Sequence, residues 1–246
     1  MFKFTPILLL SVPFLLSVSC KSSYKISTLE YKDYRVSASH YKDEAVWLLI
    51  KPYSDSVNKS MNDIVGIAGQ SLEKKSPEGT LGNFMVDAFY TMAAEKYKTR
   101  IDLALMNFGG IRLTQLPAGE VTRGKIFELM PFDNMLIIQR LKGTVLQELL
   151  DLIAARGGWP VAGMTMQIKD KKAVNVLVGG QALDPGKTYT VVNSDFVANG
   201  GDNADMLKSL PQENIGYLMR DALFDYIQKQ GKKIGARLEN RVSYVQ

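Results

Sequence analysis

The sequence of 246 residues contains only one histidine, His40, and one cysteine, Cys20. A single cysteine cannot form a disulfide within the chain. A catalytic centre with two metal ions uses several histidine and carboxylate ligands, so one histidine is too few to build one. His40 has no second metal-binding neighbour and is typical of an ordinary surface residue, which leaves neither a Ser-His-Asp triad nor a Cys-His pair. We therefore expect no catalytic residue, metal or cofactor in this chain itself.

The first 42 residues have the composition of an export signal followed by a tether. Lys3 precedes an apolar run, residues 7–18, that is too short to span a bilayer, and this is typical of a signal peptide over residues 1–19. Cys20 follows a small residue at the end of that run, a pattern similar to a bacterial lipobox. We expect a lipid on Cys20, a polar tether over residues 20–42, and an exported lipoprotein anchored in a membrane and facing the periplasm or the cell surface. A chance cysteine near a cleavage site is the alternative.

The chain is only mildly basic. Its formal net charge is +5, and removal of residues 1–19 takes away one lysine and leaves +4. This charge suits a small anionic ligand, but no block of lysines and arginines interleaved with aromatic residues is present. We therefore expect no nucleic acid among its partners.

Beyond the tether, residues 43–246 predict a single α+β domain of mixed sheets and helices. Apolar residues at three- and four-residue steps predict a helix over residues 43–62, which Pro52 should kink or split. A second helix is predicted over residues 80–97, where Thr80 can cap the first turn. The other predicted elements are helices over 123–129, 144–155 and 215–229, and strands over 64–68, 102–107, 135–141, 164–169, 173–178, 188–193 and 237–244.

Three segments share one pattern, in which an apolar strand or short helix ends and glycine, proline or asparagine accompanies an aromatic or charged residue. They are residues 107–112, 131–134 and 196–202. Strand ends in α/β proteins are common ligand sites, so these segments are candidate walls of one pocket. For the first segment alone, a Gly-Gly turn with a surface arginine is an equally good interpretation.

The chemistry of the three segments is complementary. Phe132 and Phe196 can grip a flat ring from both faces. Asp202 and Asn107 can accept hydrogen bonds from sugar hydroxyls, Asn134 can donate and accept at a ring edge, and the Arg112 guanidinium suits an anionic group. A stacked base with its ribose is a natural ligand. Alternatively, both phenylalanines belong to the core and Asp202 only caps a turn.

Four segments in order resemble the C-terminal, substrate-binding domain of the 5′-nucleotidase family, whose members hydrolyse nucleotides and nucleotide sugars. Residues 81–88, LGNFMVDA, resemble its Leu-Gly-Asn helix, and residues 107–112, NFGGIR, resemble its Asn-x-Gly-Gly-Ile-Arg segment. Residues 131–134, PFDN, and 196–202, FVANGGD, are similar to its Pro-Phe-x-Asn and Phe-x-Ala-x-Gly-Gly-Asp segments. The resemblance extends over about residues 43–246.

The resemblance implies a role for each matching residue. Phe132 and Phe196 would sandwich the base, Asn134 would meet its edge, and Asp202 would hold the ribose hydroxyls. Asn107 and Arg112 would reach the sugar and phosphate end, and Gly158 would lie close to the base. The full set of substrate-binding residues that we expect is Asn107, Gly109, Gly110, Arg112, Phe132, Asn134, Gly158, Phe196, Gly201 and Asp202.

The chain departs from the family pattern at two points. Pro77 stands where the family usually carries an arginine, so one phosphate contact is missing, and Lys74 and Lys75 are the nearby candidates to replace it. The metallophosphatase domain with its two metal ions has no counterpart here. We expect a domain that binds a nucleotide or nucleoside and presents it to a separately encoded metallophosphatase, as a split 5′-nucleotidase in nucleotide catabolism. A surface lipoprotein that only captures nucleosides or nucleotides, and a relic scaffold, are the alternatives.

Overall fold

The computed structural model describes residues 28–33, 35 and 43–245, which divide into one unit up to Trp47 and a second from Leu48 onward. In the first unit, residues 28–33 are exposed and belong to no helix or strand. The predicted signal peptide, Cys20, His40 and most of the predicted tether lie outside the described residues and stay predictions. No helix among the residues described is long and apolar enough to cross a membrane.

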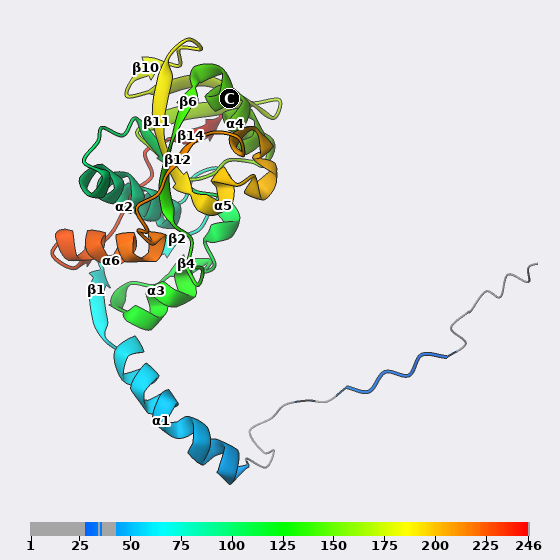
Figure 1. The fold of residues 1–246 in the computed structure, drawn as a ribbon, viewed down its shortest axis with the longest axis vertical. Coiled ribbons are helices and arrows are strands. Elements are labelled where there is room, and N and C mark those ends of the chain that lie inside the picture. Colours follow the sequence, from blue (N-terminus) through cyan, green and yellow to red (C-terminus); the bar gives the residue numbers. More distant parts are fainter. Residues whose placement is uncertain (1–27, 34, 36–42, 246) are drawn as a thin grey trace, which may run out of the picture. The chain divides into compact units, whose positions relative to one another are not determined.

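A five-stranded mixed sheet forms the centre of the second unit, in the strand order β12-β6-β11-β3-β7 (Figure 1). Strands β11 and β3 are parallel neighbours, whereas β6 is antiparallel to β11 over seven residue pairs. The strands are β3 (Leu103–Leu105), β6 (Leu136–Lys142), β7 (Val161–Ala162), β11 (Thr188–Ser194) and β12 (Gln212–Glu213).

The two faces of this sheet pack into two different hydrophobic cores. Leu103 and Leu105 point into one core, while Ala104 and Met106 point into the other, because successive side chains along a strand alternate between faces. The first core contains helix α4 (Gly143–Ala155) and the second contains α2 (Thr80–Tyr97) and α6 (Met219–Lys229). Figure 1 shows the long strands β6 and β11 between α2 and α4. The α+β class predicted from the sequence is confirmed.

Three smaller sheets complete the domain, in the strand orders β13-β1-β5, β10-β9-β8-β14 and β2-β4. Short helices follow several of the strands. The strands are β1 (Ile64–Ala68), β2 (Leu72–Glu73), β4 (Gln115–Leu116), β5 (Gly119–Thr122), β8 (Met164–Lys169), β9 (Lys172–Val178), β10 (Gln181–Ala182), β13 (Lys233–Ile234) and β14 (Val242–Tyr244), and the helices are α3 (Arg123–Leu129), α5 (Asp195–Ala198), η1 (Phe108–Gly110), η2 (Gly201–Asn203) and η3 (Asp205–Leu207).

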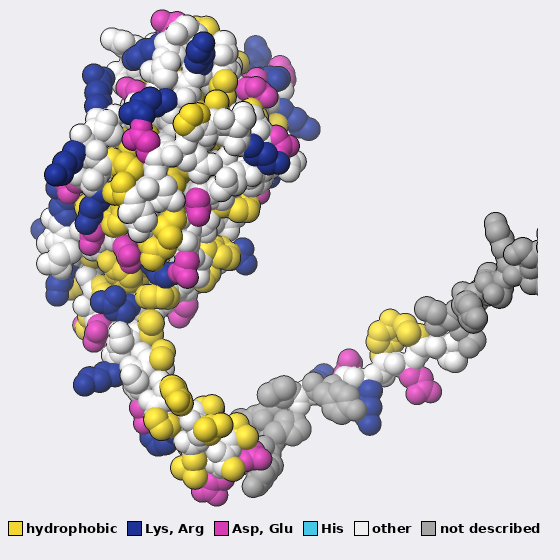
Figure 2. Space-filling model, in the orientation of Figure 1, with side chains coloured by type: hydrophobic (Ala, Val, Ile, Leu, Met, Phe, Trp, Pro, Cys, Tyr) yellow, Lys and Arg dark blue, Asp and Glu magenta, His cyan; other side chains and the backbone are white. Residues whose placement is uncertain are grey.

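Helix α1 (Glu44–Met61) excludes one of the two effects predicted for Pro52, a split of the helix. It runs as one helix of 18 residues with Pro52 inside, so the predicted split does not occur. A proline removes only its own backbone donor and crowds one preceding turn, and the rest of the hydrogen-bond ladder continues. None of the residues of α1 is buried, and its apolar side chains, such as Leu49 and Tyr53, are exposed (Figure 2).

The start of α2 also corrects an expectation. Gly79, not Thr80, is the residue before the first helical turn, and no side chain caps it. The Thr80 hydroxyl instead accepts a hydrogen bond of 2.9 Å from the backbone N–H of Glu73. Thr80 therefore ties β2 to α2, a role that only the tertiary pairing provides.

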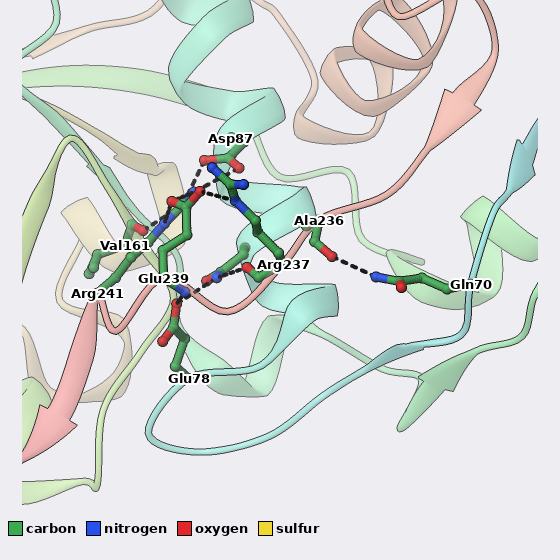
Figure 3. Close-up of polar contacts among 9 residues, drawn as sticks. Gln70, Glu78, Asp87, Val161, Ala236, Arg237, Glu239 and Arg241 are labelled. Atoms are coloured by element: carbon green, nitrogen blue, oxygen red, sulfur yellow. Dashed lines mark hydrogen bonds and ion pairs between the residues drawn. The ribbon is translucent and has the colours of Figure 1, made fainter.

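Polar contacts fasten the C-terminal segment, which follows β13, onto α2 (Figure 3). The Arg241 guanidinium donates to both carboxylate oxygens of Asp87, at 2.6 and 2.9 Å, and to Glu239 at 2.9 Å. These bonds raise the pKa of Arg241, although its burial opposes the shift. Such bidentate pairs are among the stronger polar contacts in proteins, so this contact anchors the C-terminal segment.

Asn83, in the Leu-Gly-Asn segment, belongs to the same group of contacts. Its side chain is buried, and its Nδ2 donates to Glu78 at 2.7 Å and to the carbonyl of Arg237 at 2.9 Å. A buried amide needs such partners to offset the loss of water. This part of the motif thus holds the domain together and does not contact the cavity described below.

Candidate ligand-binding cavity

Sheet topology brings the three predicted segments to one edge. Strands β3 and β11 are parallel, so residues 107–112 and 195–202, which follow them, leave the sheet at the same end. Strand β6 is antiparallel to β11, and its first residue, Leu136, pairs with the last residue of β11, Ser194. Residues 131–134, which precede β6, therefore lie at that end too.

A cavity of about 270 Å³ opens between these segments. Eight of the ten substrate-binding residues expected from the sequence line it, and four further residues do so that the sequence did not suggest. The expected residues are Asn107, Gly109, Gly110, Arg112, Phe132, Asn134, Phe196 and Asp202, and the others are Met106, Met130, Ser194 and Met219.

The two phenylalanines of the cavity are exposed. Phe132 is 43% exposed and Phe196 is 46% exposed, which overturns the alternative that both belong to the core. Gly201 lies directly against the Phe196 ring, since a Cβ atom on Gly201 would stand 2.4–2.5 Å from three ring carbons. Gly201 therefore does not line the cavity but leaves the space that the Phe196 ring occupies.

Asn107 and Asp202 form a direct pair across the cavity wall. The Asn107 Nδ2 atom donates to a carboxylate oxygen of Asp202 at 2.6 Å, and Arg156 lies 3.6 Å from the other oxygen. Asn107 is buried, whereas Asp202 is partly exposed and has a left-handed backbone conformation, with φ of 53°. The pair leaves the Asp202 carboxylate facing the cavity as a fixed acceptor.

Asn134 is oriented by a residue that sequence reasoning missed. Its Nδ2 atom donates to Asp195 Oδ1 at 3.0 Å, and the same oxygen accepts the backbone N–H of Phe196 at 2.8 Å. A carboxylate only accepts hydrogen bonds, so the Asn134 amide must turn its nitrogen toward Asp195. Asp195 stands one residue before the predicted Phe196, and no sequence signal indicated that it would meet Asn134.

Arg112 lines the cavity, and Lys74, which does not, contacts the loop that carries Arg112. Arg112 is exposed, and its guanidinium carbon lies 5.6 Å from the centre of the Phe132 ring. The Lys74 ammonium donates to the carbonyl of Ile111 at 2.9 Å and lies 4.2 Å from the centre of the Phe108 ring. Burial and the nearby charge of Arg112 lower the pKa of Lys74.

Gly158 is the other expected residue that does not line the cavity. It has a φ of +105° and packs on Pro77, whose carbonyl oxygen would stand 3.0 Å from a Cβ atom on Gly158. Pro77, the residue that replaces the arginine expected from the resemblance, thus fills the space beside the glycine turn. The contact of Gly158 with a base stays a prediction.

Among residues 28–33, 35 and 43–245, no group of three His, Cys, Asp or Glu side chains is arranged to hold a metal ion.

Three methionines from separate parts of the chain form an apolar lining of the cavity. Met106 and Met130 directly precede predicted motifs, whereas Met219 comes from α6, and its approach could not be read from the sequence.

Comparison with known proteins identifies the family of this domain. The family profile of the 5′-nucleotidase C-terminal domain matches residues 57–209, more than half of the chain. The trifunctional nucleotide phosphoesterase YfkN of Bacillus subtilis is 30% identical over 74% of this chain and 13% of its own length. The protein UshA of Yersinia enterocolitica is 27% identical over 76% of this chain and 35% of its own length.

A solved structure supports the same assignment. The 5′-nucleotidase precursor of Thermus thermophilus superposes with a TM-score of 0.71 and 27% identity, over 83% of this chain and 44% of that protein. The chain thus spans at most about a third of the two curated relatives and less than half of this structure. It belongs to the family of 5′-nucleotidase C-terminal domains.

Proposed function

We propose that the cavity binds a nucleoside or nucleotide, with the base between Phe132 and Phe196. The observation that carries this proposal is the pair of half-exposed phenylalanines on one cavity. Exposure of such large apolar side chains costs solvation free energy that a stacked ring would recover. A volume of about 270 Å³ is near the lower end of small-molecule sites, which suits a base with its sugar.

The polar residues of the cavity fit the rest of a nucleoside. The Asp202 carboxylate, held by Asn107, would accept hydrogen bonds from the ribose hydroxyls. Asn134 would meet the edge of the base, and Arg112 would lie at the end that carries phosphate. The names of the relatives, which are nucleotide phosphoesterases and 5′-nucleotidases, support this class of ligand.

Calorimetry of the purified protein against AMP and adenosine tests this proposal. Phe132→Ala and Phe196→Ala should each weaken binding by about 1–3 kcal/mol, the range for a base stacked on an aromatic side chain. Tyr53→Ala is the matched control, because Tyr53 is an exposed aromatic residue of α1 that does not line the cavity. Unchanged dissociation constants in both phenylalanine variants would refute the sandwich.

We further propose that the domain presents its ligand to a separately encoded metallophosphatase. The sequence supports this with its single histidine and single cysteine, too few for the two-metal chemistry of nucleotide hydrolysis. Phosphate release from AMP by a candidate metallophosphatase should rise when this protein is added. AMP binding without any such rise would favour the alternative of capture alone. Export and lipidation at Cys20 remain part of the proposal.

A further inference from the structure

Arg220 lies behind the loop that carries Phe132. It is the second residue of α6, directly after Met219, which lines the cavity. The Arg220 side chain is only 9% exposed and does not itself line the cavity. A buried guanidinium needs partners for its charge and for its donors, so the contacts of Arg220 indicate which part of the fold it serves.

Among the residues described, the hydrogen bonds of the Arg220 side chain all go to residues 130–133. Its Nη1 atom donates to the backbone carbonyls of Met130 and Phe132, at 3.2 Å in each case. Its Nη2 atom donates to the Asp133 carboxylate at 2.5 Å. A guanidinium has donors in fixed directions, so one side chain holds the backbone before and after Pro131 at the same time.

The loop has little else to fix it. Within the described part of the chain, residues 131–133 belong to no helix or strand, and Arg220 makes all of their hydrogen bonds. The Phe132 ring is 43% exposed, so close packing does not fix it either. The next residue, Asn134, is also tied to α6, because its carbonyl accepts the backbone N–H of Met219 at 2.9 Å.

Helix α6 does not itself favour an arginine at this position. The positive end of a helix dipole lies at the N-terminus, so a cation in the first turn does not stabilise the helix. The guanidinium is instead placed by the Phe127 ring, whose centre lies 4.1 Å from its central carbon, and by the three acceptors of the loop. The contacts of Arg220 therefore serve the loop.

We propose that Arg220 is a positioning residue, which fixes Phe132 at the cavity and thereby sets the affinity for a base that Arg220 does not touch. This rests on the proposed function above. A ring that is already held in place loses less conformational entropy when a ligand stacks on it. Without Arg220, the loop and its ring gain freedom that binding must remove again.

A double-mutant cycle with calorimetry tests the proposal, using adenosine and AMP as ligands. We expect Arg220→Met to weaken both ligands by about three- to tenfold, and by no more than Phe132→Ala does, since the ring loses its fixed place but stays in the chain. In the Phe132→Ala background, Arg220→Met should add less than about twofold, because the residue through which it acts is gone. Arg220→Lys should lose less than Arg220→Met, since an ammonium reaches only part of the three acceptors.

Arg123→Met is the matched control. Arg123 also lies in the first turn of a helix, α3, with its guanidinium carbon 4.8 Å from the centre of an aromatic ring, that of Phe224. It does not line the cavity and has no contact with residues 131–133 among the interactions of the described residues. Arg123→Met should therefore leave both affinities unchanged.

The outcomes separate this inference from the proposal on which it rests. If adenosine binds and Phe132→Ala weakens it, but Arg220→Met has no effect, the positioning role is wrong while the base site stands. Equal losses from Arg220→Met in the wild type and in the Phe132→Ala background would also overturn it, because Arg220 would then support the domain as a whole. If neither ligand binds the wild type, the proposed function fails and this inference fails with it. Should Arg220→Met not fold, Arg220→Lys takes its place in the same cycle.

Discussion

The contact between Gly201 and Phe196 gives the sharpest test of the cavity, because it moves an aromatic ring without removing it. A Cβ atom on Gly201 would stand 2.4 Å from one carbon of the Phe196 ring and 2.5 Å from two others. Real Cβ contacts are more than 1 Å longer, at the ordinary carbon–carbon separation of about 3.5–4.0 Å. In Gly201→Ala the ring must therefore leave its position.

The expected magnitude follows from what that displacement removes. Base–aromatic stacking stabilises a complex by about 1–3 kcal/mol, which corresponds to roughly 5- to 150-fold in the dissociation constant. Since the displaced ring keeps part of its contact, we expect Gly201→Ala to weaken AMP and adenosine about tenfold. Both ligands should lose the same factor, because both carry the same base.

Calorimetry with AMP and adenosine measures the effect, and Gly69→Ala is the matched control. Gly69 does not line the cavity, and a Cβ atom there would meet nothing within 4 Å. Gly69→Ala should therefore change binding little. If Gly201→Ala binds both ligands as the wild type does, the position of Phe196 does not determine affinity, and the sandwich is refuted.

Two further predictions concern residues that orient or anchor others. Asp195→Asn places beside Asn134 a side chain that can donate as well as accept, so either end of the Asn134 amide can face it. The amide then no longer distinguishes the edges of two bases, and the ratio of adenosine to inosine affinity, measured by calorimetry, should move several-fold toward one. Arg241→Met breaks the ion pair between Arg241, which is 12% exposed, and Asp87, which is 30% exposed. We expect it to lower the free energy of unfolding, measured in urea, by about 2–3 kcal/mol, because the pair is mostly but not fully buried.

Both predictions have an outcome that would contradict them. An affinity ratio that stays constant in Asp195→Asn would mean that another group sets the amide orientation. For the anchor, Arg237→Met is the matched variant, since the Arg237 side chain is 85% exposed and pairs with Glu239 at the surface. It should cost less than about 1 kcal/mol. Equal losses in the two arginine variants would contradict the anchoring role of Arg241.

Local pattern was sufficient for much of the fold. The bounds predicted for two helices, 80–97 and 123–129, are those of α2 and α3, because apolar periodicity and helix-breaking residues are both local properties. The helix predicted from residue 215 begins only at Met219, since the residues before it lie in a loop and an isolated bridge, where Leu218 pairs with Met135. That pairing depends on a distant segment and leaves no local signal.

The candidate site divides in the same way. The motifs alone indicated a set of ligand-binding residues, Asn107, Arg112, Phe132, Phe196 and Asp202. Strand ends rich in glycine, proline and asparagine can be recognised from the sequence. Their meeting at one cavity depends on a parallel pair, β3 and β11, with β6 antiparallel beside them, and strand order is a property of the whole chain.

Only the tertiary structure decided the roles of the neighbouring residues. It assigned Asn83 to the anchor of the C-terminal segment, Gly201 to the support of a ring, and Gly158 to packing on Pro77. It also brought Lys74, and not Lys75, into contact with the loop of residues 107–112. Sequence determined which chemical groups the chain has available. Long-range strand pairing and close packing determined which of them meet, because both arise between segments that are far apart along the chain.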